Sequence, residues 1–136
     1  MRVLFDTNVL FAAFTSAGLC FEVVEEGVQR CEVVTSRELL TELSGALRKK
    51  FRFGPATREA LSEFRRLSEI VKPRPLPGPV CRDRDDDAVL ATAIAGSVDV
   101  IVTGDSDLLV LRQHGAVKIL SPRQFLELLT PRSAPS

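Results

Sequence analysis

The sequence predicts an α/β fold in which a mostly parallel central β-sheet is covered on both faces by α-helices. Short, continuously apolar segments, typical of buried strands, alternate with longer segments whose apolar residues recur at helical spacing. The chain has 136 residues, of which 45% are apolar, and this is the usual size of a domain with one core. We therefore expect a single domain over residues 1–129 and a flexible C-terminal tail over residues 130–136.

The first third of the chain predicts two strands and two helical segments. Apolar runs predict strands at Arg2–Phe5 and Glu32–Val34. Between them, apolar residues at helical spacing predict helical segments at Val9–Phe14 and Phe21–Val28. This order is expected where successive parallel strands are joined by helices.

Two amphipathic helices are predicted after the second strand. The first starts with Thr35 and Glu38, which have the spacing of a capping box. Its apolar stripe consists of Leu39, Leu40, Leu43, Ala46 and Leu47. Gly54 and Pro55 end that unit, and Thr57 is expected to start the next helix. The stripe of that next helix consists of Leu61, Phe64, Leu67, Ile70 and Val71.

The C-terminal half predicts another unit of strands and helices. In order, we expect a proline-rich loop, a helix and two strands at Lys72–Val80, Asp85–Ala95, Asp99–Thr103 and Ala116–Leu120. A turn with one short helical run separates the two strands. Ser121 as N-cap, Pro122 at the first helical position and Gln124 as capping partner predict a final helix through Leu129.

The composition excludes several kinds of chemistry and location. With His114 as the single histidine and Cys20, Cys31 and Cys81 widely spaced, neither structural zinc nor a disulfide framework is expected. The N-terminal residues contain no export signal, and no apolar run reaches membrane-spanning length, so we expect a cytoplasmic protein that does not contact a membrane. Eighteen basic and eighteen acidic residues cancel, so attraction of a polyanion must come from local clusters.

Two acidic residues follow predicted strands at the edge where open parallel sheets form functional crevices. Asp6 directly follows the first strand, and Asp105 follows the strand Asp99–Thr103 by one glycine. Taken alone, each is explained better as an ordinary helix cap or turn residue. The prediction of a site therefore depends on further acids that converge on the same edge.

Helical phase identifies two such acids. At 100° per residue, Glu42 lies about 100° from the centre of the apolar stripe of its helix, whereas Glu38 lies about 140° away, on the solvent face. In the helix after the proline-rich loop, Asp86 lies within about 10° of the stripe centre, with Asp87 about 90° and Asp85 about 110° away. A carboxylate on a buried stripe is costly unless it is compensated, and a bound cation is a common compensator.

Four converging carboxylates without histidine or thiol form a site for hard cations, which favours one or two Mg²⁺ or Mn²⁺ ions. Such ions can lower the pKa of a bound water and stabilise the leaving oxygen of a phosphodiester. We therefore predict metal-dependent phosphodiester hydrolysis. The predicted catalytic metal ligands are Asp6, Glu42, Asp86 and Asp105, with Asp87 as a rival to Asp86.

The ordered set of acid motifs resembles that of the PIN-domain family. The resemblance is in particular to its small bacterial and archaeal members that are toxins of toxin–antitoxin pairs (VapC-like). The resemblance spans about residues 1–128. The four acid motifs correspond to the segments VLFDTNVL, ELLTELSGAL, RDRDDDAVLATAIA and VTGDSDLL. The resemblance assigns the four acids as above, with Asp86 favoured over Asp87 as the third. It also implies supporting roles for Thr7, Asn8, Thr103 and Asp107.

The resemblance implies a divalent-metal-dependent endoribonuclease. Such proteins cut RNA with Mg²⁺ or Mn²⁺, often form homodimers, and are commonly silenced by a cognate antitoxin that covers the acidic crevice. One alternative is a catalytically silent PIN-fold module that binds RNA or protein. Another is a magnesium-dependent aspartate phosphotransferase, which fits poorly because that chemistry uses Asp-x-Asp after the first strand and here the third position is Asn8.

A basic cluster at the end of the helix that carries Glu42 suggests where RNA binds. Lysine and arginine side chains bind nucleic acid chiefly through backbone phosphates. Most such clusters are simply solvated helix ends, so the RNA contact is a hypothesis. Its residues are Arg48, Lys49, Lys50 and Arg52.

Overall fold

The computed structural model describes residues 1–81 and 84–130, apart from the side chains of Arg84 and Asp85. The predicted tail beyond Thr130 and the first two residues of the third acid motif, Arg82 and Asp83, lie outside the described residues. No single helix in the described part of the chain is long and apolar enough to span a membrane. Helices α1 (Thr7–Thr15) and α2 (Leu19–Arg30) reach that length and composition only as a pair, which is bent by 107°.

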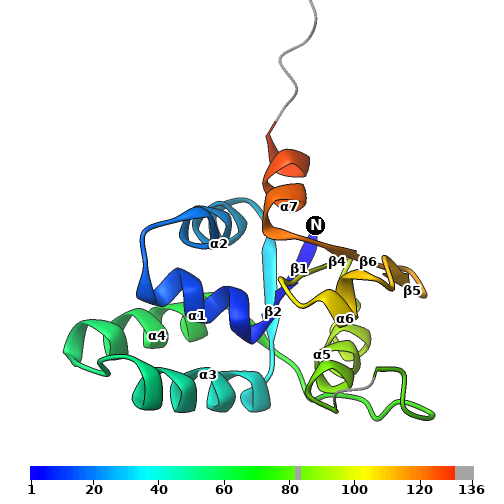
Figure 1. The fold of residues 1–136 in the computed structure, drawn as a ribbon, viewed down its shortest axis with the longest axis horizontal. Helices are drawn as coiled ribbons and strands as arrows, with labels where there is room; N and C mark the ends of the chain where they lie inside the picture. Colours follow the sequence, from blue (N-terminus) through cyan, green and yellow to red (C-terminus); the bar gives the residue numbers. More distant parts are fainter. Residues whose placement is uncertain (82–83, 131–136) are drawn as a thin grey trace, which may run out of the picture.

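The centre of the fold is a six-stranded sheet in the order β3-β2-β1-β4-β6-β5 (Figure 1). Every neighbouring pair is parallel except β5 and β6, which are antiparallel. This confirms the predicted mostly parallel sheet. The strands are β1 (Arg2–Phe5), β2 (Glu32–Thr35), β3 (Glu69–Ile70), β4 (Val100–Val102), β5 (Gln113–His114) and β6 (Val117–Leu120).

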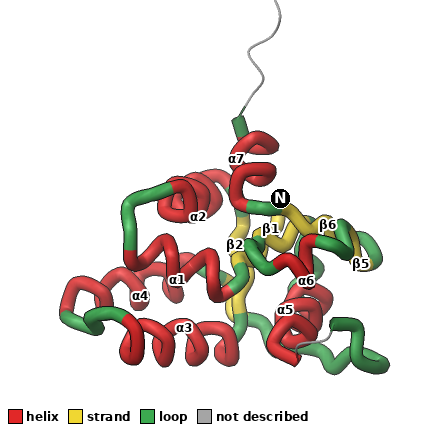
Figure 2. Tube along the Cα trace, viewed as in Figure 1, coloured by secondary structure: helices red, strands yellow, loops and turns green. Residues whose placement is uncertain are grey.

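Helices cover both faces of the sheet, as predicted. They are α1 (Thr7–Thr15), α2 (Leu19–Arg30), α3 (Arg37–Lys50), α4 (Pro55–Leu67), α5 (Arg84–Ala95), α6 (Ser106–Leu109) and α7 (Pro122–Leu129). Helices α1 to α4 lie on one side of the sheet, and α5 and α6 lie on the other (Figures 1 and 2). Alternate strand residues point to opposite faces, so β1 serves both cores. Val3 and Phe5 pack with α1, α2, α4 and α7, whereas Leu4 packs with α5 and α6.

One glycine permits the close packing of α2 on the sheet. A Cβ atom at Gly27 would lie 2.5 Å from the ring of Phe5, closer than real Cβ contacts. The Phe5 ring in turn meets Phe125 edge to face, with ring centroids 5.9 Å apart. The absence of a side chain at this position therefore lets Phe5 fill the space beneath α2 and α7.

Two predicted helix starts are wrong by one or two residues. Ser36, rather than Thr35, caps α3, and its side chain accepts the backbone N–H of Leu39. Thr35 is the last residue of β2, where its backbone is extended. Helix α4 begins at Pro55 rather than at Thr57, because proline suits the first helical position, which needs no N–H donor.

Two short strands were missed in the sequence. Ile70, predicted as part of a helical stripe, instead belongs to β3 and pairs with Thr35 of β2. His114, predicted to lie in a turn, belongs to β5 and pairs with Val117. Each strand has two residues, and a segment of that length is too short to show a period-two pattern. Only pairing with the neighbouring strand therefore defines it as a strand.

Candidate functional site

Two predicted acids lie at the point where the order of strand addition reverses from one side of β1 to the other. The chain adds β2 and β3 on one side of β1 and then returns to place β4 on its other side. Open α/β sheets bind ligands beyond the carboxyl ends of strands at such a switch point. Asp6 directly follows β1, and Asp105 caps α6, which follows β4. The two acids therefore come from neighbouring strands.

An open cavity of about 410 Å³ lies at this point, and we call it the acidic cavity. All four predicted acids line it: Asp6 after β1, Glu42 of α3, Asp86 of α5 and Asp105 before α6. Four separate segments of the chain thus contribute carboxylates to one space. The remaining lining residues are Thr7, Asn8, Phe11, Ala46 and Lys50.

A chain of hydrogen bonds joins the two strand-end acids. The backbone N–H of Asp105 donates to Thr103 Oγ1 over 2.9 Å, and the Thr103 hydroxyl donates to Asp6 Oδ2 over 2.7 Å. Thr103 is fully buried, so this hydroxyl does not exchange its partners for water. Asn8 links the same two loops, since its Nδ2 donates to Asp6 Oδ2 and its Oδ1 accepts the N–H of Gly104. The positions of Asp6 and Asp105 are therefore coupled.

Burial makes Asp6 hard to ionise. Its residue surface is only 6% exposed, and this desolvation raises the pKa of its carboxyl above the usual value. The negative charge of Asp105 raises the pKa of Asp6 further. Hydrogen bonds from Thr103, Thr7 and Asn8 act in the opposite direction, because they stabilise the carboxylate. The site thus holds an acid for which a nearby cation would be a favourable partner.

The structure separates the roles of the adjacent Asp86 and Asp87. Asp86 is 4% exposed and lines the acidic cavity, so the inward direction predicted from helical phase is correct. The Asp87 carboxylate instead accepts the backbone N–H groups of Val80 and Cys81. Asp87 therefore attaches the proline-rich connector to the start of α5. The side chain of Asp85 lies outside the described residues.

The donor set fits a hard divalent cation. Asp86, Asp105 and Asp107 can each place one carboxylate oxygen within 4.8 Å of the others, which is close enough for ligands of a single ion. The hydroxyl of Thr7, which also lines the cavity, is buried without a hydrogen-bond partner among the described residues. Oxygen ligands of this kind suit Mg²⁺ and Mn²⁺ rather than softer metals. The sequence predicted only a supporting role for Asp107, because its position depends on the turn into α6.

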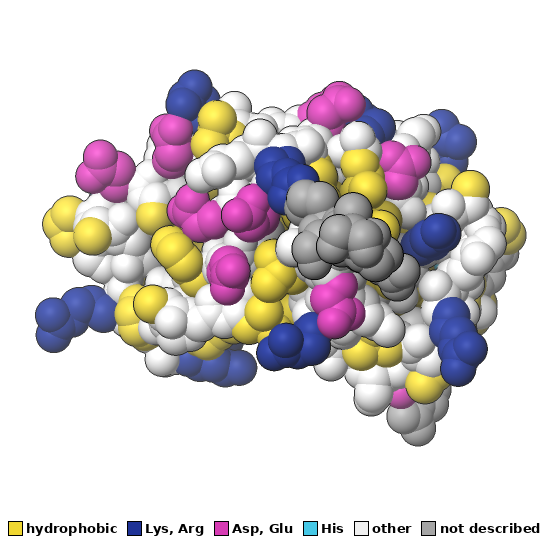
Figure 3. Space-filling model, turned by 90° about the horizontal axis from the view of Figure 1, so that it is seen from above, with side chains coloured by type: hydrophobic (Ala, Val, Ile, Leu, Met, Phe, Trp, Pro, Cys, Tyr) yellow, Lys and Arg dark blue, Asp and Glu magenta, His cyan; other side chains and the backbone are white. Residues whose placement is uncertain are grey.

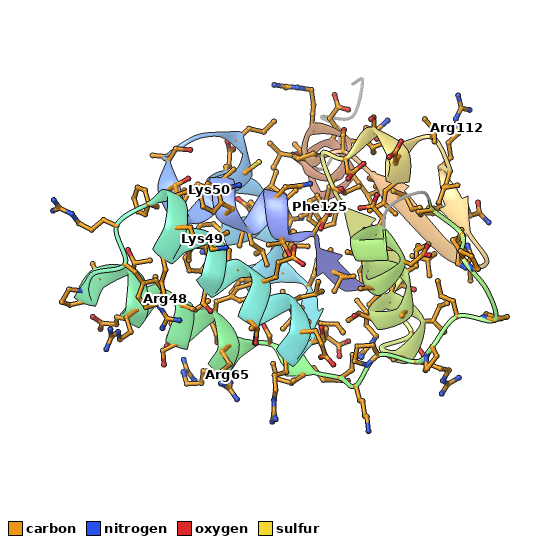
Figure 4. The ribbon with its side chains drawn as sticks, turned by 60° about the horizontal axis from the view of Figure 1, so that its bottom comes forward. Arg48, Lys49, Lys50, Arg65, Arg112 and Phe125 are labelled. Atoms are coloured by element: carbon orange, nitrogen blue, oxygen red, sulfur yellow. The ribbon has the colours of Figure 1, made fainter. Side chains whose placement is uncertain are left out.

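The four basic residues predicted to contact RNA lie in different surroundings. Lys50 lines the acidic cavity, on the same side of α3 as Glu42. The Arg48 guanidinium instead lies over the ring of Phe53, 4.6 Å from its centroid. Lys49 and Arg52 are exposed outside the cavity lining. The labelled side chains in Figure 4 show this divergence at the end of α3.

One face of the molecule shows how charged side chains are distributed on its surface. On the face seen from above, acidic, basic and apolar side chains are interspersed (Figure 3). This agrees with the zero formal net charge of the chain. Attraction of a charged ligand must therefore come from particular residues at a site.

Comparisons with known proteins agree with this fold. The family model of the PIN domain matches residues 2–107. The chain is 28% identical to an uncharacterized protein, MJ1680 of Methanocaldococcus jannaschii, over 93% of this chain and 90% of that protein. Among solved structures, it resembles a chain of VapBC2 from Rickettsia felis, which was crystallised bound to a DNA fragment from their promoter. The TM-score is 0.63 at 15% identity, with 89% of this chain and 98% of that chain covered, and this likeness shows the fold.

Proposed function

This chain belongs to the PIN-domain family, and on that premise we propose that it is a divalent-metal-dependent endoribonuclease. The observation that carries the proposal is the acidic cavity, in which four segments of the chain bring Asp6, Glu42, Asp86 and Asp105 together. Carboxylates held close together repel one another, and a bound cation would compensate their charges. A nuclease uses such a cation on the phosphate of its substrate.

The residues divide into metal ligands and residues that hold them. Asp86, Asp105 and Asp107 would hold one ion, and Asp6 and Glu42 complete the ligands for a first or second ion. One or two bound Mg²⁺ or Mn²⁺ ions would supply an activated water and would stabilise the leaving oxygen. Asp105 is held in place because its Oδ1 accepts the backbone N–H of Asp107 over 2.8 Å.

Thr103 and Lys50 have different tasks in this proposal. Thr103 fixes the orientation of Asp6, because its hydroxyl donates to Asp6 and accepts from Asp105. Lys50 places a positive charge at the rim of the acidic cavity, where it can bind a backbone phosphate of RNA. The proposed contact of Arg48, Lys49 and Arg52 with RNA is weaker than that of Lys50, because none of the three lines this cavity and Arg48 covers Phe53.

We further propose that the protein is a cytoplasmic toxin component with a cognate antitoxin, and that it forms a homodimer. The resemblance of its acid motifs to those of toxin members supports this, as does its fold, which is shared with a chain of VapBC2. An antitoxin that covers the acidic cavity would silence the enzyme because it excludes RNA from the carboxylates. Copurification of an antitoxin encoded by a neighbouring gene, and loss of RNA cleavage in the complex, would test this proposal.

The first experiment is cleavage of a panel of structured and single-stranded RNAs by the purified protein. Each RNA is incubated with Mn²⁺, Mg²⁺ or EDTA, beside the double variant Asp6→Asn/Asp105→Asn. Glu38→Gln is the matched control, because Glu38 lies on α3 but is exposed outside the cavity lining. We expect metal-dependent cleavage that the double variant loses and the control keeps. RNA binding without cleavage under any metal condition would instead indicate a silent binding module.

A further inference from the structure

A second hollow lies across α3 from the acidic cavity, and we call it the arginine pocket. It has a volume of about 150 Å³ and lies between α3, α4 and β3. Its polar lining consists of Arg37, Thr41, Ser44 and Arg65. Its apolar lining consists of Leu40, Leu61 and Ile70, of which Ile70 is 40% exposed. Two cations therefore stand over an apolar floor, and no acid belongs to the lining.

The guanidinium groups of the two arginines take no part in the polar contacts that stabilise the described part of the fold. Within the described residues, the guanidinium groups of Arg37 and Arg65 make no hydrogen bond or ion pair. The neighbouring Arg66 differs, since it is paired with Glu63. The Thr41 hydroxyl makes no hydrogen bond within the described residues, whereas the Ser44 hydroxyl donates to the Thr41 carbonyl. Uncompensated guanidinium groups beside a hydroxyl donor are suited to a phosphate.

The phase of α3 relates this pocket to the acidic cavity. Glu42 and Lys50 line the cavity, whereas Arg37 and Ser44 line the arginine pocket. At 100° per residue the two sets lie about 170° apart around the helix. Gly45 lies between them on the solvent side, and the space where its Cβ would be is open. Figure 4 shows the same relation, with Lys50 and Arg65 on opposite sides of α3.

We propose that the arginine pocket binds one nucleotide of a single-stranded RNA whose scissile phosphate lies in the acidic cavity. Arg37 and Arg65 bind its phosphate, and the apolar floor takes the face of its base or ribose. The strand crosses α3 over Gly45, a helix about 10–12 Å across. This inference rests on the proposed RNA substrate. It adds a substrate-length requirement, because RNA too short to cross the helix reaches only the cavity.

The test is RNA binding by the Asp6→Asn/Asp105→Asn protein, which is expected not to cleave the RNA. Affinities are measured by fluorescence anisotropy across a salt series, with single-stranded RNAs of about two and about twelve nucleotides. Adding Arg37→Gln/Arg65→Gln is expected to weaken binding of the longer RNA about tenfold. It should also reduce the slope of log affinity against log salt by about 0.7 to 1.4, at about 0.7 per lost phosphate contact. Binding of the shorter RNA should not change.

The matched control is Arg112→Gln/Arg123→Gln, which removes the same charge from exposed positions outside the pocket. It should leave the affinities for both RNA lengths and the salt slope unchanged. Circular dichroism checks that the proteins carrying either pair of arginine substitutions are folded. Arg37→Lys/Arg65→Lys should keep most of the salt slope, because it keeps the charges. Three outcomes for Arg37→Gln/Arg65→Gln overturn the inference. These are unchanged binding of the longer RNA, equal losses of affinity for both RNA lengths, or a loss of affinity for an acidic peptide, measured in the same assay, with no loss of affinity for RNA.

The result is separable from the proposed nuclease activity. If the parent protein cleaves no RNA but the longer RNA still binds through Arg37 and Arg65, the nuclease proposal fails and the RNA pocket stands. If the parent cleaves RNA but both arginines are dispensable at every length, the arginine pocket is refuted and the nuclease stands.

Discussion

Two hollows of similar size lie at opposite ends of α1, and they are built in different ways. The acidic cavity, of about 410 Å³, takes Thr7 and Asn8 from the first turn of α1. An apolar groove of about 440 Å³ takes Ala13 and Phe14 from its last turns, with further residues from α2 and α4. The boundary between them is sharp, because Lys50 lines the cavity and the next residue, Phe51, lines the groove.

The difference lies in what fixes the side chains. In the cavity, Asp6 and Asp105 follow strands directly and are joined by hydrogen bonds through Thr103. In the groove, the positions depend on side-chain packing between helices, such as the edge-to-face contact of Phe14 with Phe64. Directional hydrogen bonds fix a carboxylate to within fractions of an ångström, whereas packing fixes mainly volume. Substitutions in the acidic cavity should therefore change mainly RNA cleavage, whereas substitutions in the apolar groove should change mainly stability.

The largest effect is expected from Asp86→Asn, which should lower RNA cleavage by about 10³-fold and leave the fold intact. The reason is that Asp86 offers a carboxylate oxygen to the group formed with Asp105 and Asp107. Single-turnover cleavage and thermal unfolding measure the two parts. The control is Asp87→Asn, which should keep near-normal cleavage. Full activity in the first variant and its loss in the second would reverse the assignment of the third acid.

In the other region, Phe64→Ala should destabilise the protein by about 3–5 kcal/mol without changing the cleavage rate of the folded fraction. Phe64 is 5% exposed and packs edge to face on Phe14, so its removal leaves a cavity. Urea unfolding measures the loss. Phe21→Ala, which removes a side chain that is 45% exposed, should change stability by less than about 0.5 kcal/mol. Equal losses in both variants would show that the groove is not a packed surface.

An intermediate effect is expected at Thr103, which is buried and also hydrogen-bonded to the acids of the cavity. Thr103→Val should lower cleavage about 10–100-fold and cost about 1–3 kcal/mol of stability. Valine has the shape of threonine but cannot accept from Asp105 or donate to Asp6. Thr103→Ser retains the hydroxyl and should restore most of the activity, as measured by cleavage rates beside urea unfolding. A valine variant with full activity would show that the hydrogen-bond chain does not position the acids.

The smallest effect concerns the connector that Asp87 holds. Burial raises the pKa of the Cys81 thiol to about 11, and the charge of Asp87 contributes to that shift. Because the thiolate is the reactive form, alkylation of Cys81 should accelerate only as the pH rises toward that value. Asp87→Asn removes the like charge, so it should lower the pKa and accelerate alkylation several-fold at pH of about 9. Peptide mapping after iodoacetamide treatment measures this, with Cys20 as an internal reference.

Local sequence predicted the parallel order of strands and helices and the positions of three of the four acids that line the acidic cavity. Asp6 and Asp105 were identified because each directly follows an apolar strand, and Asp86 because helical phase placed it on a buried face. The capped start of α7 was also predicted, and Ser121 and Gln124 form the expected capping box. Each of these depends on residues a few positions apart, so short-range spacing was sufficient.

Tertiary structure decided what depends on partners far along the chain. Thr103 bonds to Asp6 across 97 residues, and β3 exists because Ile70 pairs with β2. Sequence spacing could not show that Lys50 faces the cavity while Arg48 covers Phe53, because both stand at one basic helix end. The orientation of a side chain on a helix follows from its phase, but the group that it meets follows from how the helices pack. That packing is set by the whole core and not by any one segment.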